Sequence, residues 1–165
     1  MIPIRQALDI LQENMPQARM ETVDLAAAQG RYLAEAVMAP EPSPRYTNSA
    51  MDGYALRWAD VSRASAESPV MLRVIGESRA GMPFEEKVGP NMAVHISTGA
   101  MLPAGTDTVV RVEDTRTADN GAVEILSVRC RGQDVRCEGE EFDCGDELLC
   151  RGMQFGGQRR ERCDR

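Results

Sequence analysis

The chain has 165 residues, of which 42% are hydrophobic and 27% are charged, a composition typical of a globular protein rather than a disordered one. Its formal net charge of −7 excludes a general affinity for nucleic acid, because binding to a phosphate backbone needs clustered Lys and Arg. No apolar run approaches the ~20 residues of a membrane helix, and the charged N-terminus does not resemble a signal peptide. We therefore expect a cytoplasmic protein that binds no membrane.

The N-terminal residues repeat apolar side chains at helical spacing. They are Ile4, Ala7, Leu8, Leu11 and Met15. This spacing predicts an amphipathic helix over residues 3–14, with a proline in its first turn. A short strand over 22–25 and a helical turn through the following alanines are expected next, ending at Gly30, because glycine commonly terminates helices.

The middle of the chain changes to a period of two after a rigid connector that contains Pro40, Pro42 and Pro44. Strands are predicted over 70–75, 92–97, 108–114, 122–129 and 146–150. Several short strands with intervening turns favour a β-rich α+β fold. We expect a compact, barrel-like β domain of residues 44–133, inserted into an elongated β-containing domain of residues 1–43 and 134–165 that includes the N-terminal helix.

Five cysteines lie in the last quarter of the chain, at positions 130, 137, 144, 150 and 163. Their number is odd and no Cys-x-x-Cys pair occurs, so neither a disulfide framework nor a structural zinc site is indicated. Free thiols are expected. The only histidine, His95, lies in a predicted alternating strand, where a half-exposed sheet residue is a simpler interpretation than a catalytic base.

Three polar stretches contain candidate functional residues. Asp52-Gly53 lies between small residues and, on spacing alone, favours a two-residue hairpin turn over a functional carboxylate. Thr98-Gly99 follows a predicted strand and could present a hydroxyl and a backbone N–H to an anion. The acidic loop over 133–146 could hold Mg²⁺, although a solvated loop is the simpler interpretation.

Three longer motifs include two of these stretches. Leu-x-x-Ala-x-Gly-Arg-x-Leu-Ala occurs at 25–34, and Asn-Ser-Ala-Met-Asp-Gly-Tyr-Ala occurs at 48–55. Thr-Gly-Ala-x-x-Pro-x-Gly-x-Asp-x-Val-Val-x-x-Glu occurs at 98–113. In this order they resemble the molybdopterin molybdotransferase family, which includes bacterial MoeA and the E domain of gephyrin.

The resemblance implies a role for particular residues. Asp52 and Thr98 would be catalytic residues that line one cleft, which replaces the hairpin interpretation of Asp52. Asp52 and Glu141 would hold Mg²⁺. The resemblance further implies substrate-binding residues, namely Ser49, Met51, Gly99 and Arg136.

The sequence departs from the family in the loop from Arg136 to Glu141. Cys137 and Glu138 stand where the family tends to be basic, and Glu141 replaces an aspartate. The loss of positive charge should weaken the binding of an anionic substrate. The longer glutamate should displace a bound ion by about one C–C bond.

The family reaction implied by the resemblance inserts molybdenum from molybdate into adenylylated molybdopterin, with release of AMP. In the family the pterin binds mainly to a later α/β domain, which is outside these 165 residues, and a homodimer completes the cleft. The first helix would pack on that later domain. We therefore expect a truncated transferase that is inactive without it; the alternative is a non-catalytic binding or dimerisation module.

Overall fold

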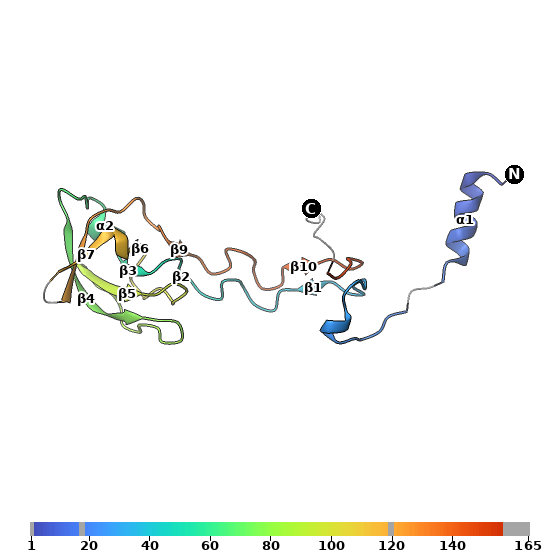
Figure 1. Cartoon of the computed structure of the whole chain (residues 1–165), viewed down its shortest axis with the longest axis horizontal. Coiled ribbons are helices and arrows are strands. Elements are labelled where there is room, and N and C mark those ends of the chain that lie inside the picture. Colours follow the sequence, from blue (N-terminus) through green and yellow to red (C-terminus); the bar gives the residue numbers. More distant parts are fainter. Residues whose placement is uncertain (1, 17–18, 119–120, 157–165) are drawn as a thin grey trace. The chain divides into compact units, whose positions relative to one another are not determined.

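The computed structural model describes residues 2–16, 19–118 and 121–156. The chain divides into two compact units: the first comprises Met1–Val37 and Glu147–Arg165, and the second comprises Met38–Asp146. Figure 1 shows the ribbon, with the helices and strands labelled where there is room. The domain boundaries expected near residues 43 and 134 stay a prediction.

The first unit begins with helix α1 (Ile4–Asn14), as the apolar spacing predicts. None of its residues is buried, and Ile4 and Leu11 are 81% and 61% exposed. The strand expected over 22–25 is wrong. The chain forms a 3-10 helix, η1 (Leu25–Ala27), at its end instead, because a short extended segment needs a neighbouring strand to satisfy its backbone groups.

Two segments far apart in the sequence are joined within this unit. The N–H of Gly30 donates to the carbonyl of Phe155 (2.8 Å), and the N–H of Leu33 donates to the carbonyl of Met153 (2.9 Å). Gly30 has a φ of 78°, in keeping with its predicted place at the end of a helical turn. A two-stranded sheet is made by β1 (Val37–Met38) and β10 (Glu147–Leu149).

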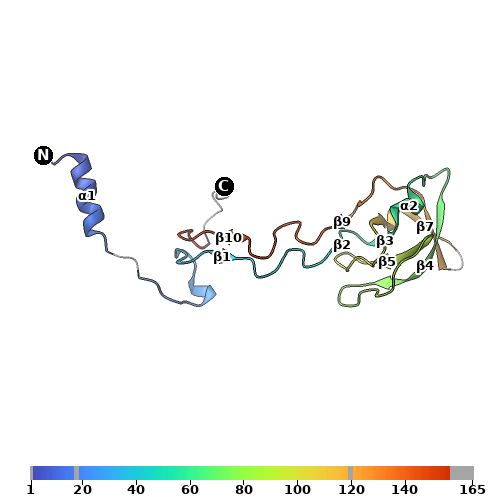
Figure 2. The ribbon, with the colours of Figure 1, turned by 180° about the vertical axis from the view of Figure 1, so that it is seen from behind.

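The second unit contains a six-stranded sheet. Its strands are β3 (Gly53–Leu56), β4 (Val70–Ser78), β5 (Met92–Ile96), β6 (Thr108–Arg111), β7 (Thr115–Ala118) and β8 (Ala122–Ile125). The spatial order is β6-β3-β5-β4-β8-β7, in which β4 and β5 are parallel and the other neighbours are antiparallel. The sheet curls into a half-barrel (Figure 2), so the β-rich α+β fold is confirmed.

Short elements complete this unit. A second, two-stranded sheet pairs β2 (Asn48–Ser49) with β9 (Val135–Arg136). Helix α2 (Trp58–Val61) follows β3, and the 3-10 helix η2 (Val112–Asp114) follows β6. The strand expected over 108–114 therefore ends three residues early, where η2 begins.

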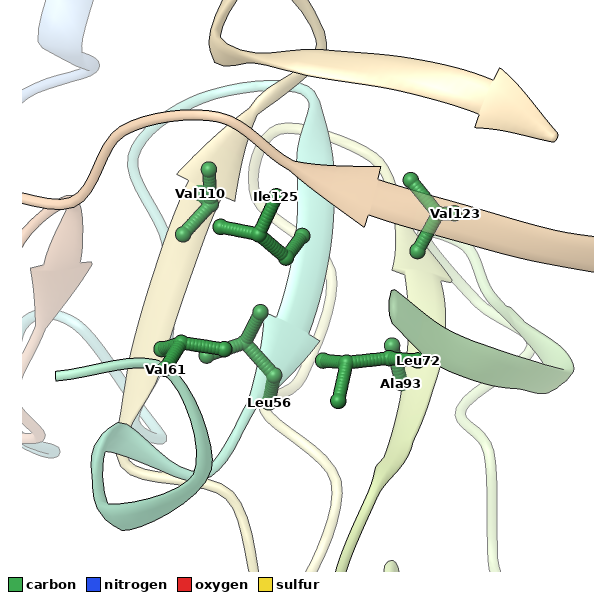
Figure 3. Close-up of a cluster of buried hydrophobic side chains, with 7 residues drawn as sticks. All are labelled: Leu56, Val61, Leu72, Ala93, Val110, Val123 and Ile125. Carbon is green, nitrogen blue, oxygen red and sulfur yellow. The ribbon is translucent and has the colours of Figure 1, made fainter. Parts of the chain in front are cut away.

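The buried hydrophobic side chains of the sheet's core are all aliphatic. Its main cluster, drawn in Figure 3, consists of Leu56, Val61, Leu72, Ala93, Val110, Val123 and Ile125. A second cluster consists of Ala55, Ile96, Ala100 and Val109. Neighbouring residues of β3, Ala55 and Leu56, belong to different clusters, so side chains cover both faces of this central strand. For the same reason Ala93 and Val94 of β5 are both buried. The predicted alternation therefore breaks at Ala93 but holds from Val94 to Ser97, where buried and half-buried residues alternate.

The cysteines divide into two groups. Cys130, Cys137 and Cys144 are exposed free thiols. Cys150 is disulfide-bonded, which corrects the expectation of a free thiol at this position. Cys163 lies outside the described residues. Over the described part of the chain, no helix has the length and apolar character needed to cross a membrane.

Substitutions on opposite faces of β4 test the packing of the sheet. Leu72 is 1% exposed and its neighbour Met71 is 60% exposed. Leu72→Ala should lower the free energy of unfolding by about 2–5 kcal/mol, because it leaves a cavity in the core. Met71→Ala should change it by less than about 0.5 kcal/mol. Urea denaturation measures both, and equal effects would contradict the described burial.

Helix α1 generates a second prediction. An isolated helix shorter than about 12–15 residues is marginal in water, and α1 has 11 residues, none of them buried. Its amides should exchange with solvent far faster than those of the paired strands β4 and β8. Hydrogen exchange followed by NMR measures this difference. Strong protection throughout α1 in a monomer would show that the helix has a packing partner.

Candidate functional site

The candidate site centres on a hydrogen-bonded pair, Asp52 and Thr98. The backbone N–H of Thr98 donates to Oδ1 of Asp52 at 2.7 Å, and the Thr98 hydroxyl donates to the same oxygen at 3.0 Å. Both residues are exposed. The structure thus brings together two residues that are 46 positions apart in the sequence and that were expected to share one cleft.

Strand pairing positions the two residues. Asp52 immediately precedes β3 and Thr98 follows β5, and the register of these strands places Gly53 opposite Ile96. Gly53 also lies opposite Arg111 of β6, where an added Cβ would come within 2.1 Å of the Val110 carbonyl oxygen. Only glycine permits this approach of the two backbones.

The hairpin turn first inferred for Asp52-Gly53 is wrong. The strands on either side of it, β2 and β3, do not pair with each other: β2 pairs with β9, whereas β3 pairs with β5 and β6. Gly53 is also absent from the described glycines with positive φ. The glycine at position 53 is needed for the close approach of the β3 and β6 backbones rather than for a turn conformation.

Ser49 supports the backbone before Asp52 from the interior. It is 0% exposed, and its hydroxyl donates to the Met51 carbonyl at 2.5 Å. The Ser49 carbonyl accepts the N–H of Gly99 at 2.8 Å, and Gly99 has a φ of 78°. Ser49 therefore connects the segment that carries Asp52 to the loop that carries Thr98. Direct binding of substrate by Ser49, Met51 and Gly99 stays a prediction.

Arg136 and Glu141 lie on the segment beyond the sheet. Arg136 belongs to β9, where it pairs with Asn48, and is exposed. Glu141 accepts the hydroxyl of Ser43 at 2.8 Å, and its own N–H donates to the Ser43 carbonyl at 2.9 Å. Among the described residues, Glu141 makes no hydrogen bond with Asp52.

The part of the chain that the structure describes therefore offers an incomplete donor set for a divalent cation. Among the described residues no group of three or more His, Cys, Asp or Glu side chains is arranged to hold a metal ion. Asp52 offers one carboxylate oxygen beyond the one bound by Thr98, and Glu141 is engaged with Ser43. The residues do not by themselves fit a bound Mg²⁺, and the assignment of this ion to Asp52 and Glu141 stays a prediction.

His95 has a more specific environment than sequence reasoning predicted. Its Nδ1 lies 3.3 Å from Oε1 of Glu77, and its ring meets that of Tyr54 edge-on, with the centroids 5.3 Å apart. The side chain is 39% exposed, in keeping with the predicted half-exposed sheet residue. The contact with Glu77 was not predicted, since only the pairing of β4 with β5 brings the two residues together.

The two hydrogen bonds also control the ionisation of Asp52. The Thr98 backbone N–H and then the Thr98 hydroxyl lower the pKa of Asp52 below its ordinary value. Desolvation opposes them to a smaller extent, and the charge of His95 has the smallest effect, which also lowers the pKa. These donors stabilise the carboxylate rather than the neutral acid. Asp52 is therefore ionised at neutral pH.

A pH titration tests this arrangement. Since the folded-state pKa of Asp52 is depressed, the contribution of the pair to stability is present above the unfolded pKa and is lost as pH falls through the folded pKa.

Thr98→Ala removes the hydroxyl and keeps the backbone N–H, so the pKa of Asp52 should rise only part of the way to its ordinary value. Carboxyl ¹³C NMR measures it, with Asp134, whose pKa is lowered mainly by Arg111, as the internal control. An unchanged Asp52 titration in the variant would refute the assignment.

Comparison with known proteins places this geometry in a family. The family model described as MoeA N-terminal region (domain I and II) matches residues 2–159. A molybdopterin molybdenumtransferase of Nostoc sp. is 42% identical over 84% of this chain and 32% of its own length. The enzyme of the same name from Haemophilus influenzae is 36% identical over 94% of this chain and 37% of its own length.

A solved structure agrees. The crystal structure of the molybdopterin biosynthesis MoeA protein from Pyrococcus horikoshii superposes with a TM-score of 0.81 at 30% identity, over 91% of this chain and 40% of that one. The chain thus spans about a third of the length of the curated relatives that it matches. The family model covers nearly all of it, and the chain belongs to the MoeA (molybdopterin molybdenumtransferase) family, whose N-terminal region it matches.

Proposed function

We propose that this chain serves molybdenum cofactor biosynthesis and that Asp52 and Thr98 act where molybdenum from molybdate enters adenylylated molybdopterin. The names of the relatives, molybdopterin molybdenumtransferases, support the pathway. The main support for placing the site at these two residues is the pair of hydrogen bonds from Thr98 to Oδ1 of Asp52. The chain covers about a third of the length of these relatives.

The chemistry open to Asp52 follows from its charge. An ionised carboxylate only accepts hydrogen bonds, and at close range it repels molybdate and phosphate groups. Thr98 occupies Oδ1, and within the described residues Oδ2 accepts no hydrogen bond. Asp52 therefore orients a hydrogen-bond donor, such as a hydroxyl or water, or a cation that itself contacts the anionic substrate.

Arg136 supplies a cation near the start of this segment. It is exposed and pairs with Asn48 in the β2–β9 sheet, four residues before Asp52. A guanidinium binds phosphate oxygens with two parallel hydrogen bonds, so Arg136 is suited to an anionic group of the substrate. The neighbouring Cys137 and Glu138 add no positive charge, and we expect weaker binding than a more basic loop would give.

The homodimer and the cytoplasmic location stay predictions. The alternative function is a binding or dimerisation module without chemistry. The two functions differ in whether activity depends on the Asp52 carboxylate.

A chimaera distinguishes them. This chain would replace the region that it matches in the Haemophilus influenzae transferase, in a bacterial strain that lacks its own enzyme. The chimaera should restore molybdenum-enzyme activity, and Asp52→Asn should lower the restored activity on the order of a hundredfold, because it removes a preorganised charge from the site.

The matched control is Glu124→Gln, which removes the carboxylate of a partly exposed ion pair with Arg116 in the β7–β8 hairpin and should leave activity unchanged. Immunoblotting must show equal amounts of all variants. Wild-type activity in Asp52→Asn would contradict the proposed role of the carboxylate and support the module without chemistry.

A further inference from the structure

Asp134 has the least exposed side chain among the ion pairs of the described residues. Its side chain is 9% exposed. Arg111 donates two hydrogen bonds to this carboxylate, from Nε to Oδ2 at 2.9 Å and from Nη2 to Oδ1 at 2.8 Å. Nη2 of Arg129 makes a longer contact with Oδ2 at 3.4 Å. Two parallel bonds between a guanidinium and a carboxylate fix both distance and orientation.

The backbone of Asp134 contacts the segment that carries Asp52. Its carbonyl accepts the N–H of Ala50 at 2.8 Å, two residues before Asp52. Asp134 holds this position with a φ of 53°, which is uncommon for a residue other than glycine. The residue that follows, Val135, pairs with Ser49.

Arg111 contacts the other side of the same segment. It lies opposite Gly53 in the β3–β6 ladder, one residue after Asp52. The next residue, Val112, donates its N–H to the carbonyl of Asp52 at 3.3 Å. The Asp134–Arg111 pair therefore joins the two backbone supports of Asp52, one at Ala50 and one at Gly53.

We propose that Asp134 is a positioning residue for Asp52. Its ion pair with Arg111 holds residues 50–53 in the conformation in which Oδ1 of Asp52 meets both donors of Thr98. The importance of Asp134 for activity rests on the proposed function of Asp52, whereas its restraint on residues 50–53 does not. Asp134 touches no substrate; it acts through the backbone on either side of the carboxylate.

Asp134→Asn tests the proposal in the intact chain. Asparagine keeps the shape of the side chain and tolerates positive φ, so the variant removes mainly the charge. The amides of Ala50 and Thr98 should exchange about tenfold faster, because a charge-assisted interaction that restrains the segment is lost. The amide proton of Thr98 should also shift upfield as its bond to the carboxylate weakens. Amides shared by β4 and β8 should keep their rates.

Two further variants complete the experiment. Arg111→Lys keeps the charge but loses the two-pronged geometry, and should produce the same local pattern with a smaller change; it serves as the test if Asp134→Asn does not fold. Glu124→Gln breaks the more exposed ion pair with Arg116 and should change neither Ala50 nor Thr98.

Two outcomes would overturn the proposal. Unchanged exchange and chemical shift at Ala50 and Thr98 would show that the pair does not restrain this segment. An equal acceleration at Ala50, Thr98 and the β4–β8 amides would show a general contribution to stability only. Because these measurements involve neither substrate nor turnover, their failure is distinct from failure of the Asp52→Asn chimaera.

Discussion

The close approach of β3 to β6 at Gly53 is the constraint on which the site depends. A Cβ at this position would lie 2.1 Å from the Val110 carbonyl oxygen, so the two strands pair at this point only because residue 53 has no side chain. Asp52 is the residue before this contact, and the direction of its side chain follows from it. Thr98 is placed by the same sheet, since β5 pairs with the other edge of β3.

The hydrogen bonds around that contact differ in burial: some are buried and support the backbone, and others lie at the surface. Ser49 is buried and its hydrogen bonds join two loops, whereas Asp52 and Thr98 are exposed and bond to each other. Breaking an ion pair leaves an uncompensated charge, and the cost grows as the pair is shielded from solvent, whereas a fully exposed ion pair contributes little. The enclosed pair of Asp134 therefore suits a supporting role, and the exposed carboxylate of Asp52 remains accessible to a ligand.

The sequence predicted the elements whose burial follows a simple period. Strands β4 and β8 each have one face toward the main cluster, so apolar and polar residues alternate along parts of their sequences. Helix α1 has an apolar stripe of helical spacing. Strand β3 was missed because both of its faces are covered and Gly-Tyr-Ala-Leu shows no alternation. Strand β7 was missed because the polar edge sequence Thr-Arg-Thr-Ala resembles a loop, and β2 and β9 are too short to leave a pattern.

The site was only partly predictable for a related reason. Local spacing at Asp52-Gly53 favoured a hairpin, and only the family motifs indicated a functional carboxylate paired with Thr98. The contacts of Asp134 with Arg111 and of His95 with Glu77 span 23 and 18 residues. The register of β4 with β5 brings Glu77 to His95, and a backbone hydrogen bond from Val109 to Gln133 brings the segment before β9 to β6. Such contacts follow from topology, which no short motif encodes.

The aliphatic composition of the core has a consequence for oxidative damage. Among the described residues the buried hydrophobic side chains are Leu, Val, Ile and Ala, whereas six methionines are well exposed, namely Met15, Met20, Met38, Met71, Met82 and Met101. Peroxide converts thioethers to polar sulfoxides, which disrupts proteins chiefly where methionine is packed inside. In this chain the thioethers accessible to an oxidant are separated from the packing that holds the sheet together, so they can be consumed before the interior is harmed.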